Sequence, residues 1–271
     1  MIRKRLKQIA LLALLVLAVV LIHNRVQLEA EEAAHEAEIA VAQTEEPDDA
    51  QQSMTVIRLG NDTALADVAE NTERGGIDLT VHEADGTETV YTFTDVAIDS
   101  WYVDAVNFVV SANLMKGLGD EPIFHPEYGI LREELASILY RYTNGEQVTP
   151  NYQFEDVPEG EWYYDCVSWV TNRRLMSGLT PTTFGVGEYM TCEQALIAIY
   201  RLAGQPETDG SLLDYPYAAK VSDYARKAVD WAWKSGLITE KECVWYPPQA
   251  ISRAQVALLL TRFSTMDFEK N

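Results

Sequence analysis

An amphipathic pattern occurs three times from residue 93 onward and predicts three helices. Apolar side chains stand four, seven and eight residues after Trp101, which places them on one face of a helix. The pattern returns 61 residues later after Trp162, and a further 62 residues later after Tyr224. Each predicted helix stops just before a Leu-Met or Leu-Ile pair, at Asn113, Arg174 and Gly236.

A second helix is predicted in each copy, eight residues after an aromatic side chain. The predicted starts are Arg132, Cys192 and Arg253. Thr191-x-x-Gln194 and Ser252-x-x-Gln255 have the form of capping boxes, whereas Leu131 in the first copy lacks the hydroxyl. Nine residues after each start an arginine is placed to complement the helix macrodipole: Arg141, Arg201 and Arg262. Because two-helix units of this size cannot bury their own apolar faces, we expect the three copies to pack into one body.

The chain ahead of the repeats carries three further patterns. A run of 14 apolar residues, Ile9–Ile22, follows several basic residues, so 1–25 is predicted to be a signal peptide or, because no small-residue cleavage site follows, an uncleaved signal anchor. The acidic, alanine-rich residues 26–52 are expected to form a spacer. In 53–92, alternating apolar residues around Asp85-Gly86 predict a small β-hairpin.

Charge and residue types restrict the partners and the chemistry. The chain has 42 acidic against 21 basic residues and a net charge of −21, which disfavours nucleic acid, so an anionic partner must be gripped locally. Three cysteines (Cys166, Cys192 and Cys243) support neither a disulfide framework nor a zinc site. No catalytic triad, paired metal-binding histidines or phosphate loop is present, so we expect a protein without enzymatic activity or cofactor.

The repeated motifs resemble the S-layer homology (SLH) domain over Phe93 to Met266. They comprise Phe93-Thr-Asp95-Val96 and Phe154-Glu-Asp156-Val157 before the aromatic-led helices, and Ile-Ser-Arg253-Ala-Gln at a second helix. The resemblance implies a mainly α fold in which three tandem two-helix SLH-like repeats, 93–148, 149–208 and 209–271, form a pseudo-threefold bundle, beside the N-terminal anchor helix and the hairpin. In that family the grooves of the bundle bind secondary cell-wall polymer, often through a pyruvylated amino sugar.

Several residues are candidates for polymer binding. Arg132 and Arg253 occupy the first turn of a helix, where the macrodipole disfavours a cation but a carboxylate could be bound by the guanidinium and free N–H groups together. The family motif adds carboxylates that could accept sugar hydroxyl hydrogens and aromatic rings that could stack on a sugar, namely Asp95, Asp156, Trp101, Trp162 and Tyr224.

Structural roles remain open for each of these residues. The aromatic rings could pack in the core, the aspartates could cap a turn, and the arginines could pair with neighbouring carboxylates. Cys166 stands where the other copies have alanine and is expected to be a small core residue. The second copy has Cys192 in place of the motif arginine, and the third has Tyr217 where we place the motif aspartate, so one or two of the three grooves are expected to be competent.

Two functions follow from these patterns. The first is a non-catalytic protein exported to the cell envelope, tethered to the membrane by its anchor and bound to an anionic, pyruvylated wall polysaccharide. The alternative is an envelope structural or protein-interaction scaffold whose degenerate repeats no longer bind polymer. An enzyme is disfavoured because only about 40 residues lie outside the repeats, the leader and the spacer.

Overall fold

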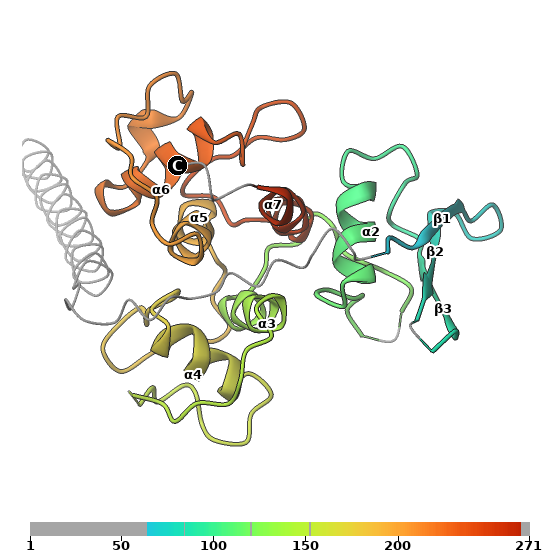
Figure 1. The fold of residues 1–271 in the computed structure, drawn as a ribbon, viewed down its shortest axis with the longest axis horizontal. Coiled ribbons are helices and arrows are strands. Elements are labelled where there is room, and N and C mark those ends of the chain that lie inside the picture. Colours follow the sequence, from blue (N-terminus) through green and yellow to red (C-terminus); the bar gives the residue numbers. More distant parts are fainter. Residues whose placement is uncertain (1–63, 84, 120, 152, 267–271) are drawn as a thin grey trace, which may run out of the picture. The chain divides into compact units, whose positions relative to one another are not determined.

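The computed structural model describes residues 64–83, 85–119, 121–151 and 153–266, all within one compact unit, 47–271. These residues form a three-stranded sheet, six α-helices and two short 3-10 helices (Figure 1). The predicted anchor (1–25) and spacer (26–52) lie outside the described residues. None of the helices in the described part of the chain is long and apolar enough to span a membrane.

The predicted hairpin is present as part of an antiparallel meander. Strands β2 (Ile77–His82) and β3 (Glu88–Phe93) pair on either side of the Asp85-Gly86 turn, where Gly86 has φ +85°. A further strand, β1 (Asp67–Glu70), pairs with the other edge of β2. Along β2, Ile77, Leu79 and Val81 alternate with more exposed residues and are buried, as the period-two pattern predicts.

The segment that leads into the sheet is held by helix α2 (Val103–Ser111). The buried Asn107 side chain accepts a hydrogen bond from Ala66 N at 3.0 Å and donates one to Ala66 O at 2.9 Å. At the other end of the sheet, Phe93 meets Phe124 edge to face with ring centroids 5.5 Å apart. These contacts join the sheet to the first copy.

The six α-helices form three pairs, one in each copy of the sequence repeat. The first helices of the copies are α2, α4 (Tyr164–Asn172) and α6 (Arg226–Lys234). The second helices are α3 (Arg132–Tyr142), α5 (Cys192–Leu202) and α7 (Arg253–Thr265), which begin at the predicted residues. The two predicted capping boxes are formed in α5 and α7.

The first helices end slightly earlier than predicted, two residues before a left-handed residue. The three left-handed residues are those predicted as stops: Asn113 (φ +54°), Arg174 (φ +57°) and Gly236 (φ +75°). The next N–H groups return to helix carbonyls, as when Leu114 N donates to Val109 O. This satisfies carbonyls that would otherwise be unpaired at a helix end.

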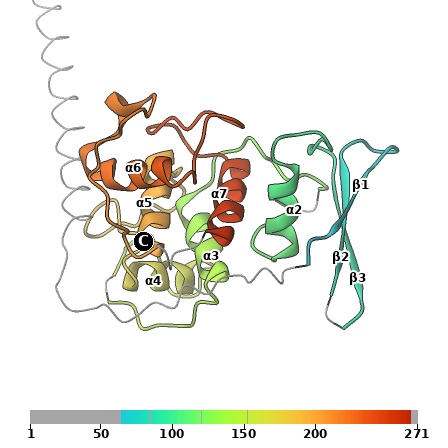
Figure 2. The same ribbon diagram turned by 45° about the horizontal axis from the view of Figure 1, so that its top comes forward.

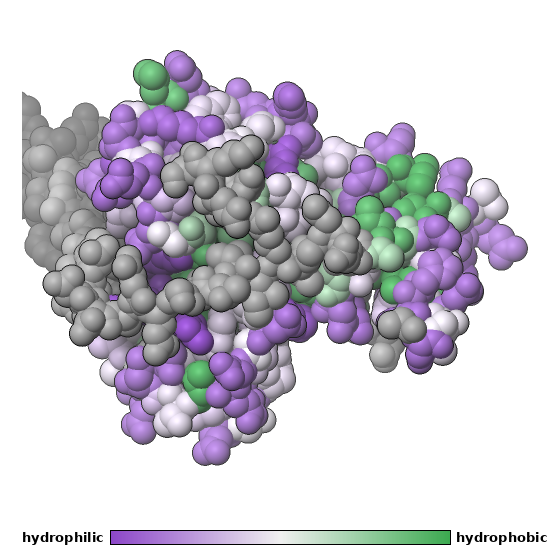
Figure 3. Space-filling model, viewed as in Figure 1, coloured by the Kyte–Doolittle hydropathy of each residue, from purple (hydrophilic) through white to green (hydrophobic). Residues whose placement is uncertain are grey.

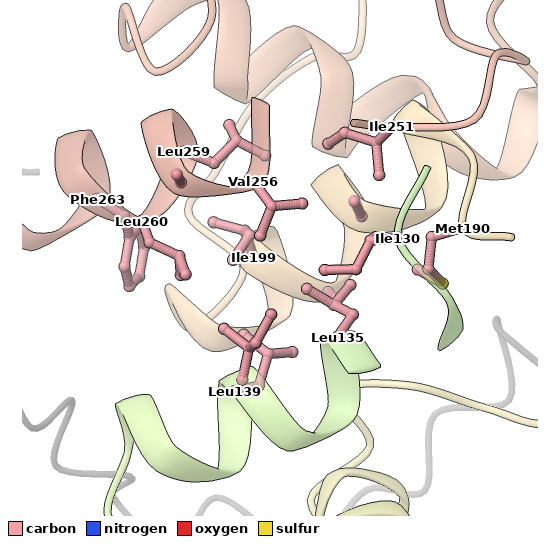
Figure 4. Close-up of a cluster of buried hydrophobic side chains, with 14 of the residues drawn as sticks. Ile130, Leu135, Leu139, Met190, Ile199, Ile251, Val256, Leu259, Leu260 and Phe263 are labelled. Carbon is pink, nitrogen blue, oxygen red and sulfur yellow. The ribbon is translucent and has the colours of Figure 1, made fainter. Parts of the chain in front are cut away.

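The first helix of each copy packs on the second helix of the preceding copy (Figures 1 and 2). Thus α4 lies on α3, α6 on α5, and α2 on α7, which joins the first copy to the last. In the centre, apolar side chains of α3, α5 and α7 meet (Figure 4), among them Leu139, Ile199 and Leu260, each at most 1% exposed. The repeat pattern alone did not predict this exchange of partners.

Three backbone hydrogen bonds form a closed ring where the second helices begin. Ile130 N donates to Ile251 O, Ile251 N to Met190 O, and Met190 N to Ile130 O, at 2.9–3.0 Å. The three side chains are 0–1% exposed and extend the central cluster (Figure 4). The ring fixes the segments that lead into α3, α5 and α7 relative to one another.

Each second helix is also tied to its own first helix by the arginine near its end. Sequence analysis assigns these arginines only to the helix macrodipole. In the structure each one donates to the carbonyl that follows the left-handed residue: Arg141 to Leu114 O, Arg201 to Leu175 O and Arg262 to Leu237 O. The same contact in every copy holds the two helices of a pair together at one end.

Candidate functional site

Arg132, at the start of α3, reaches into the second copy instead of pointing to solvent. Its side chain is 3% exposed. Nε donates to Phe184 O at 2.8 Å and a terminal nitrogen donates to Ser177 O at 2.6 Å, while the guanidinium carbon lies 4.8 Å from the centre of the Phe184 ring. Burial lowers the pKa of this guanidinium to about 10, so it stays charged at neutral pH.

Arg253, at the start of α7, makes the corresponding contacts with the first copy. It is 4% exposed and donates to Phe124 O at 2.9 Å and to Lys116 O at 2.6 Å. Its guanidinium carbon lies 4.9 Å from the centre of the Phe124 ring. The predicted alternative, pairing with a carboxylate, is therefore replaced by hydrogen bonds to main-chain carbonyls.

The motif aspartates hold the same loops from the other side. Asp156 accepts hydrogen bonds from the N–H groups of Phe184, Gly185 and Val186 at 2.7–2.8 Å. Burial acts to raise the pKa of Asp156, but these hydrogen bonds outweigh it and leave the pKa below its usual value. Asp95 accepts in the same way from Phe124 N and His125 N at 2.8 and 2.7 Å.

At two junctions between copies, the peptide groups of a phenylalanine are held between an aspartate and an arginine. We call each of these arrangements a Phe clamp. At the junction of copies 1 and 2, Phe184 donates its N–H to Asp156 and accepts from Arg132 at its carbonyl. At the junction of copies 3 and 1, Phe124 does the same with Asp95 and Arg253. Each clamp combines an arginine of one copy with an aspartate of the next.

The junction of copies 2 and 3 lacks both the arginine and the aspartate of the clamp. Cys192 stands in place of the arginine, and Trp245 in place of the phenylalanine. The hydroxyl of Tyr215 donates to Trp245 O, the carbonyl that an arginine would otherwise contact. Tyr217 stands at the aspartate position when the three copies are compared. It is half-buried and contacts Tyr246 edge to face. The two departures from the motif therefore fall at one junction.

In copies 1 and 2 a glutamate follows the position of the motif arginine. Sequence analysis did not select these two glutamates as candidates. Glu193 is 3% exposed and accepts from Ser222 N, Ser222 Oγ and Tyr224 OH at 2.7–3.0 Å. Glu133 is 5% exposed and lies within 3.1–3.2 Å of Gly187 N. A glutamate in the first turn of a helix complements the macrodipole, so its cross-junction role had no distinguishing pattern in the sequence.

The three candidate aromatic residues differ in their surroundings. Trp162 is 60% exposed and touches Tyr163 edge to face. Trp101 and Tyr224 are half-buried against the core, and the hydroxyl of Tyr224 donates a hydrogen bond to Glu193. Of the three rings, that of Trp162 is the one most available to a ligand.

The two buried cysteines lie in surroundings that disfavour a reactive thiolate. Cys192 is buried, and burial raises the pKa of its thiol, which disfavours the thiolate; Cys166 is buried beside α3, as expected of a small core residue. No group of three or more side chains suited to hold a metal ion occurs in the part of the chain that the structure describes. The roles of the seven candidate residues in polymer binding stay predictions.

One known protein family matches part of the chain. Residues 92–136 match the S-layer homology domain, a range that includes the last two residues of β3, all of α2 and the beginning of α3. The chain is 25% identical over 174 residues to an exoglucanase of Acetivibrio thermocellus, a match that covers 62% of this chain and 16% of that protein. It is 25% identical over 174 residues to a surface-layer 125 kDa protein of Lysinibacillus sphaericus, covering 61% and 14%.

A third relative is the S-layer protein sap of Bacillus anthracis, 22% identical over 181 residues that cover 63% of this chain and 21% of that protein. All three relatives are much longer than the part that resembles this chain. The S-layer homology domain and the surface-layer relatives support a cell-surface location and a role in binding the cell wall.

Proposed function

We propose that this chain is a non-catalytic anchoring protein whose three copies, 93–148, 149–208 and 209–271, are SLH-like repeats that bind an anionic, pyruvylated secondary cell-wall polymer. The match at residues 92–136 supports the first copy. The other two copies are supported by the equivalent helix starts, left-handed stops and arginine contacts. The hydrophobic run Ile9–Ile22 would tether the chain to the membrane, so that the protein links membrane and wall.

The observation that carries the proposal is the Phe clamp at two of the three junctions. A loop fixed at both its N–H and its carbonyl loses little entropy when a ligand binds to it, which favours affinity. Beneath each loop lies a buried guanidinium at the positive end of a helix, in a chain of net charge −21. This guanidinium, which in the case of Arg132 also faces carboxylates such as Asp156, is the cation that a pyruvyl carboxylate would approach. The exposed Trp162 ring suits the apolar face of a sugar.

This proposal predicts which junctions bind. The two junctions with complete clamps would take polymer. At the junction of copies 2 and 3, Tyr215 and Glu193 hydrogen-bond across the loops, and this junction would have only a structural role. Direct contact of polymer with Arg132 and Arg253 is not required, because the arginines would act by holding the loops and by their charge.

Calorimetric titration of the full chain in detergent with native and depyruvylated wall polymer tests the proposal. We expect binding to the native polymer and a large loss of affinity when the pyruvyl groups are removed. Trp162→Ala should weaken binding by about fivefold, since a stacked aromatic contributes about 1 kcal/mol. Leu213→Ala, which shortens a side chain that is 68% exposed, is the matched control and should bind as the unchanged chain does. Equal affinity for both polymers would contradict the proposal.

The alternative, a scaffold that binds another envelope protein, is favoured by one observation. The junction of copies 2 and 3 has lost both the arginine and the aspartate, as expected if selection for polymer binding has relaxed there. The scaffold would be supported if the chain bound neither the native nor the depyruvylated polymer but did bind a defined envelope protein. That binding should be unchanged in Trp162→Ala.

A further inference from the structure

The loop between Phe124, Phe184 or Trp245 and the following helix makes the same two backbone hydrogen bonds in all three copies. In the first copy Tyr128 N donates to His125 O at 3.1 Å, and Arg253 N donates to Tyr128 O at 2.9 Å. The second copy repeats both bonds with Gly185 and Glu188 in these positions, and the third with Tyr246 and Gln249. The positions can therefore be compared, and φ is positive at His125 and Gly185 but not at Tyr246.

His125 occupies a position that favours glycine. Its φ is +59°, in the left-handed region, where side chains with a Cβ are disfavoured. The second copy has Gly185 there, with φ +92°. A glycine adopts this φ without the steric penalty that a Cβ brings. Strain of this kind is often found where a side chain is needed for binding.

The imidazole of His125 lies against an exposed phenol ring. The rings of His125 and Tyr128 are stacked, with centroids 4.2 Å apart and planes inclined by 24°. Tyr128 is 59% exposed, whereas Glu188 and Gln249 at the equivalent positions are not aromatic. The stack therefore contributes little to the core and belongs to the first copy alone.

The backbone beneath the stack is fixed at both ends. His125 N donates to Asp95 Oδ2 at 2.7 Å, and Tyr128 O accepts from the main chain of α7. The two rings are thus presented on a loop that needs no further ordering before a ligand binds. An exposed phenol face suits the C–H groups of a sugar ring, and an imidazole can hydrogen-bond a hydroxyl or a carboxylate.

We propose that His125 and Tyr128 form a carbohydrate subsite at the junction of copies 3 and 1, in addition to the motif residues. The phenol ring of Tyr128 would stack on one sugar of the wall polymer, while an imidazole nitrogen of His125 hydrogen-bonds a substituent of the same residue. This inference rests on the proposed function, because it assumes that the ligand is the wall polymer. It adds two residues that none of the repeated motifs contains.

Two substitutions that copy the second repeat test this subsite. His125→Gly installs the residue found at position 185, and Tyr128→Glu installs the residue found at position 188. We expect each to weaken binding of the full chain to native wall polymer about two- to twelvefold in calorimetric titration, since an aromatic contact of this kind contributes roughly 0.5–1.5 kcal/mol. Leu213→Glu makes the same charge change at a side chain that is 68% exposed elsewhere, and should leave affinity unchanged.

Thermal unfolding separates a binding role from a structural one. Because glycine relieves the strain at position 125, His125→Gly should melt at the same or a higher temperature while it binds more weakly. A lower melting temperature would show that the imidazole stabilises the loop, and would overturn the subsite. If the unchanged chain binds no polymer, the proposed function fails. If it binds and both variants bind equally well while Trp162→Ala does not, only the subsite fails.

Discussion

At the scale of single residues, the motif charges act mainly on the backbone. Arg253 and Asp95 come from opposite ends of the repeat region, yet they hold the carbonyl and the N–H of the same residue, Phe124. A buried guanidinium that donates to carbonyls and faces an aromatic ring avoids the penalty of an unpaired buried charge. The motif therefore couples one copy to the next before any ligand is present.

His82 should make the stability of the sheet depend on pH. Its imidazole lies 3.0 Å from Asp67 on β1 and 3.3 Å from Glu88 on β3. The hydrogen bond to Asp67 and the charges of both carboxylates raise the pKa of His82 above 6.5. Since the folded-state pKa is raised, the stabilising contribution is complete below the unfolded-state pKa of about 6.5 and is lost as the pH rises through the folded-state pKa.

The measurement is an NMR titration of the His82 ring protons. We expect a midpoint above 6.5 in the unchanged chain and a lower midpoint in Asp67→Asn, which removes the nearest negative charge. The same midpoint in both proteins would show that the contact with Asp67 is not maintained in solution.

The sequence singled out Arg132 and Arg253 but not their hydrogen-bond partners. Arg132 and Arg253 stood out because a cation in the first turn of a helix opposes the macrodipole. Their carbonyl partners lie 52 and 129 residues away along the chain, and every residue has a carbonyl, so no side-chain pattern identifies them. Tyr215 was missed for the same reason, because its hydroxyl also bonds to a main-chain carbonyl.

At the scale of helices and strands, local rules were sufficient where a residue type marks the boundary. Capping hydroxyls and left-handed residues have short-range chemical requirements, so the starts of α5 and α7 and the stop at Gly236 followed from a few residues each. Strand β1 was missed because its sequence, Asp-Val-Ala-Glu, lacks β-branched and aromatic residues apart from Val68. Pairing with β2 determines its conformation.

Trp169→Ala should test how α4 packs on α3. Trp169 is 3% exposed and meets Tyr140 of α3 edge to face, with ring centroids 5.9 Å apart. Loss of the indole would leave a cavity between the two helices, so we expect the free energy of unfolding to fall by about 3–5 kcal/mol. Trp162→Ala removes the same side chain from a site that is 60% exposed, and its thermal melt should change little. A melt of Trp169→Ala that matches the unchanged chain would show that α4 does not pack on α3 in this way.

At the scale of the whole repeat region, the connection between the last copy and the first could not be predicted from periodicity. Repeats related by a fixed offset are equally consistent with an open stack and with a closed arrangement. The structure has α2 on α7, together with the backbone ring of Ile130, Met190 and Ile251. Closure means that each copy has two neighbours, so no copy needs a specialised polar cap.

Arg253 is the side chain that best tests this closure, because it joins copy 3 to copy 1. Arg253→Met keeps much of the apolar stem but leaves Phe124 O and Lys116 O without their donor, at a cost of about 1–3 kcal/mol for the buried Phe124 carbonyl. We expect local opening to become easier where these bonds were. Hydrogen exchange should therefore speed up in the first copy, at α2 and the loop of Phe124, more than in α4 or α5.

Two further variants make this result specific. Arg132→Met removes the equivalent bonds at the junction of copies 1 and 2, so exchange should increase around α4 and the loop of Phe184. Lys227→Met removes an exposed cation and should leave both regions unchanged. If Arg253→Met accelerated exchange only within α7, the first and last copies would not support each other, and the repeat region would behave as an open stack. Faster exchange at α2, 142–150 residues from the substitution, requires that the two ends of the region be in contact.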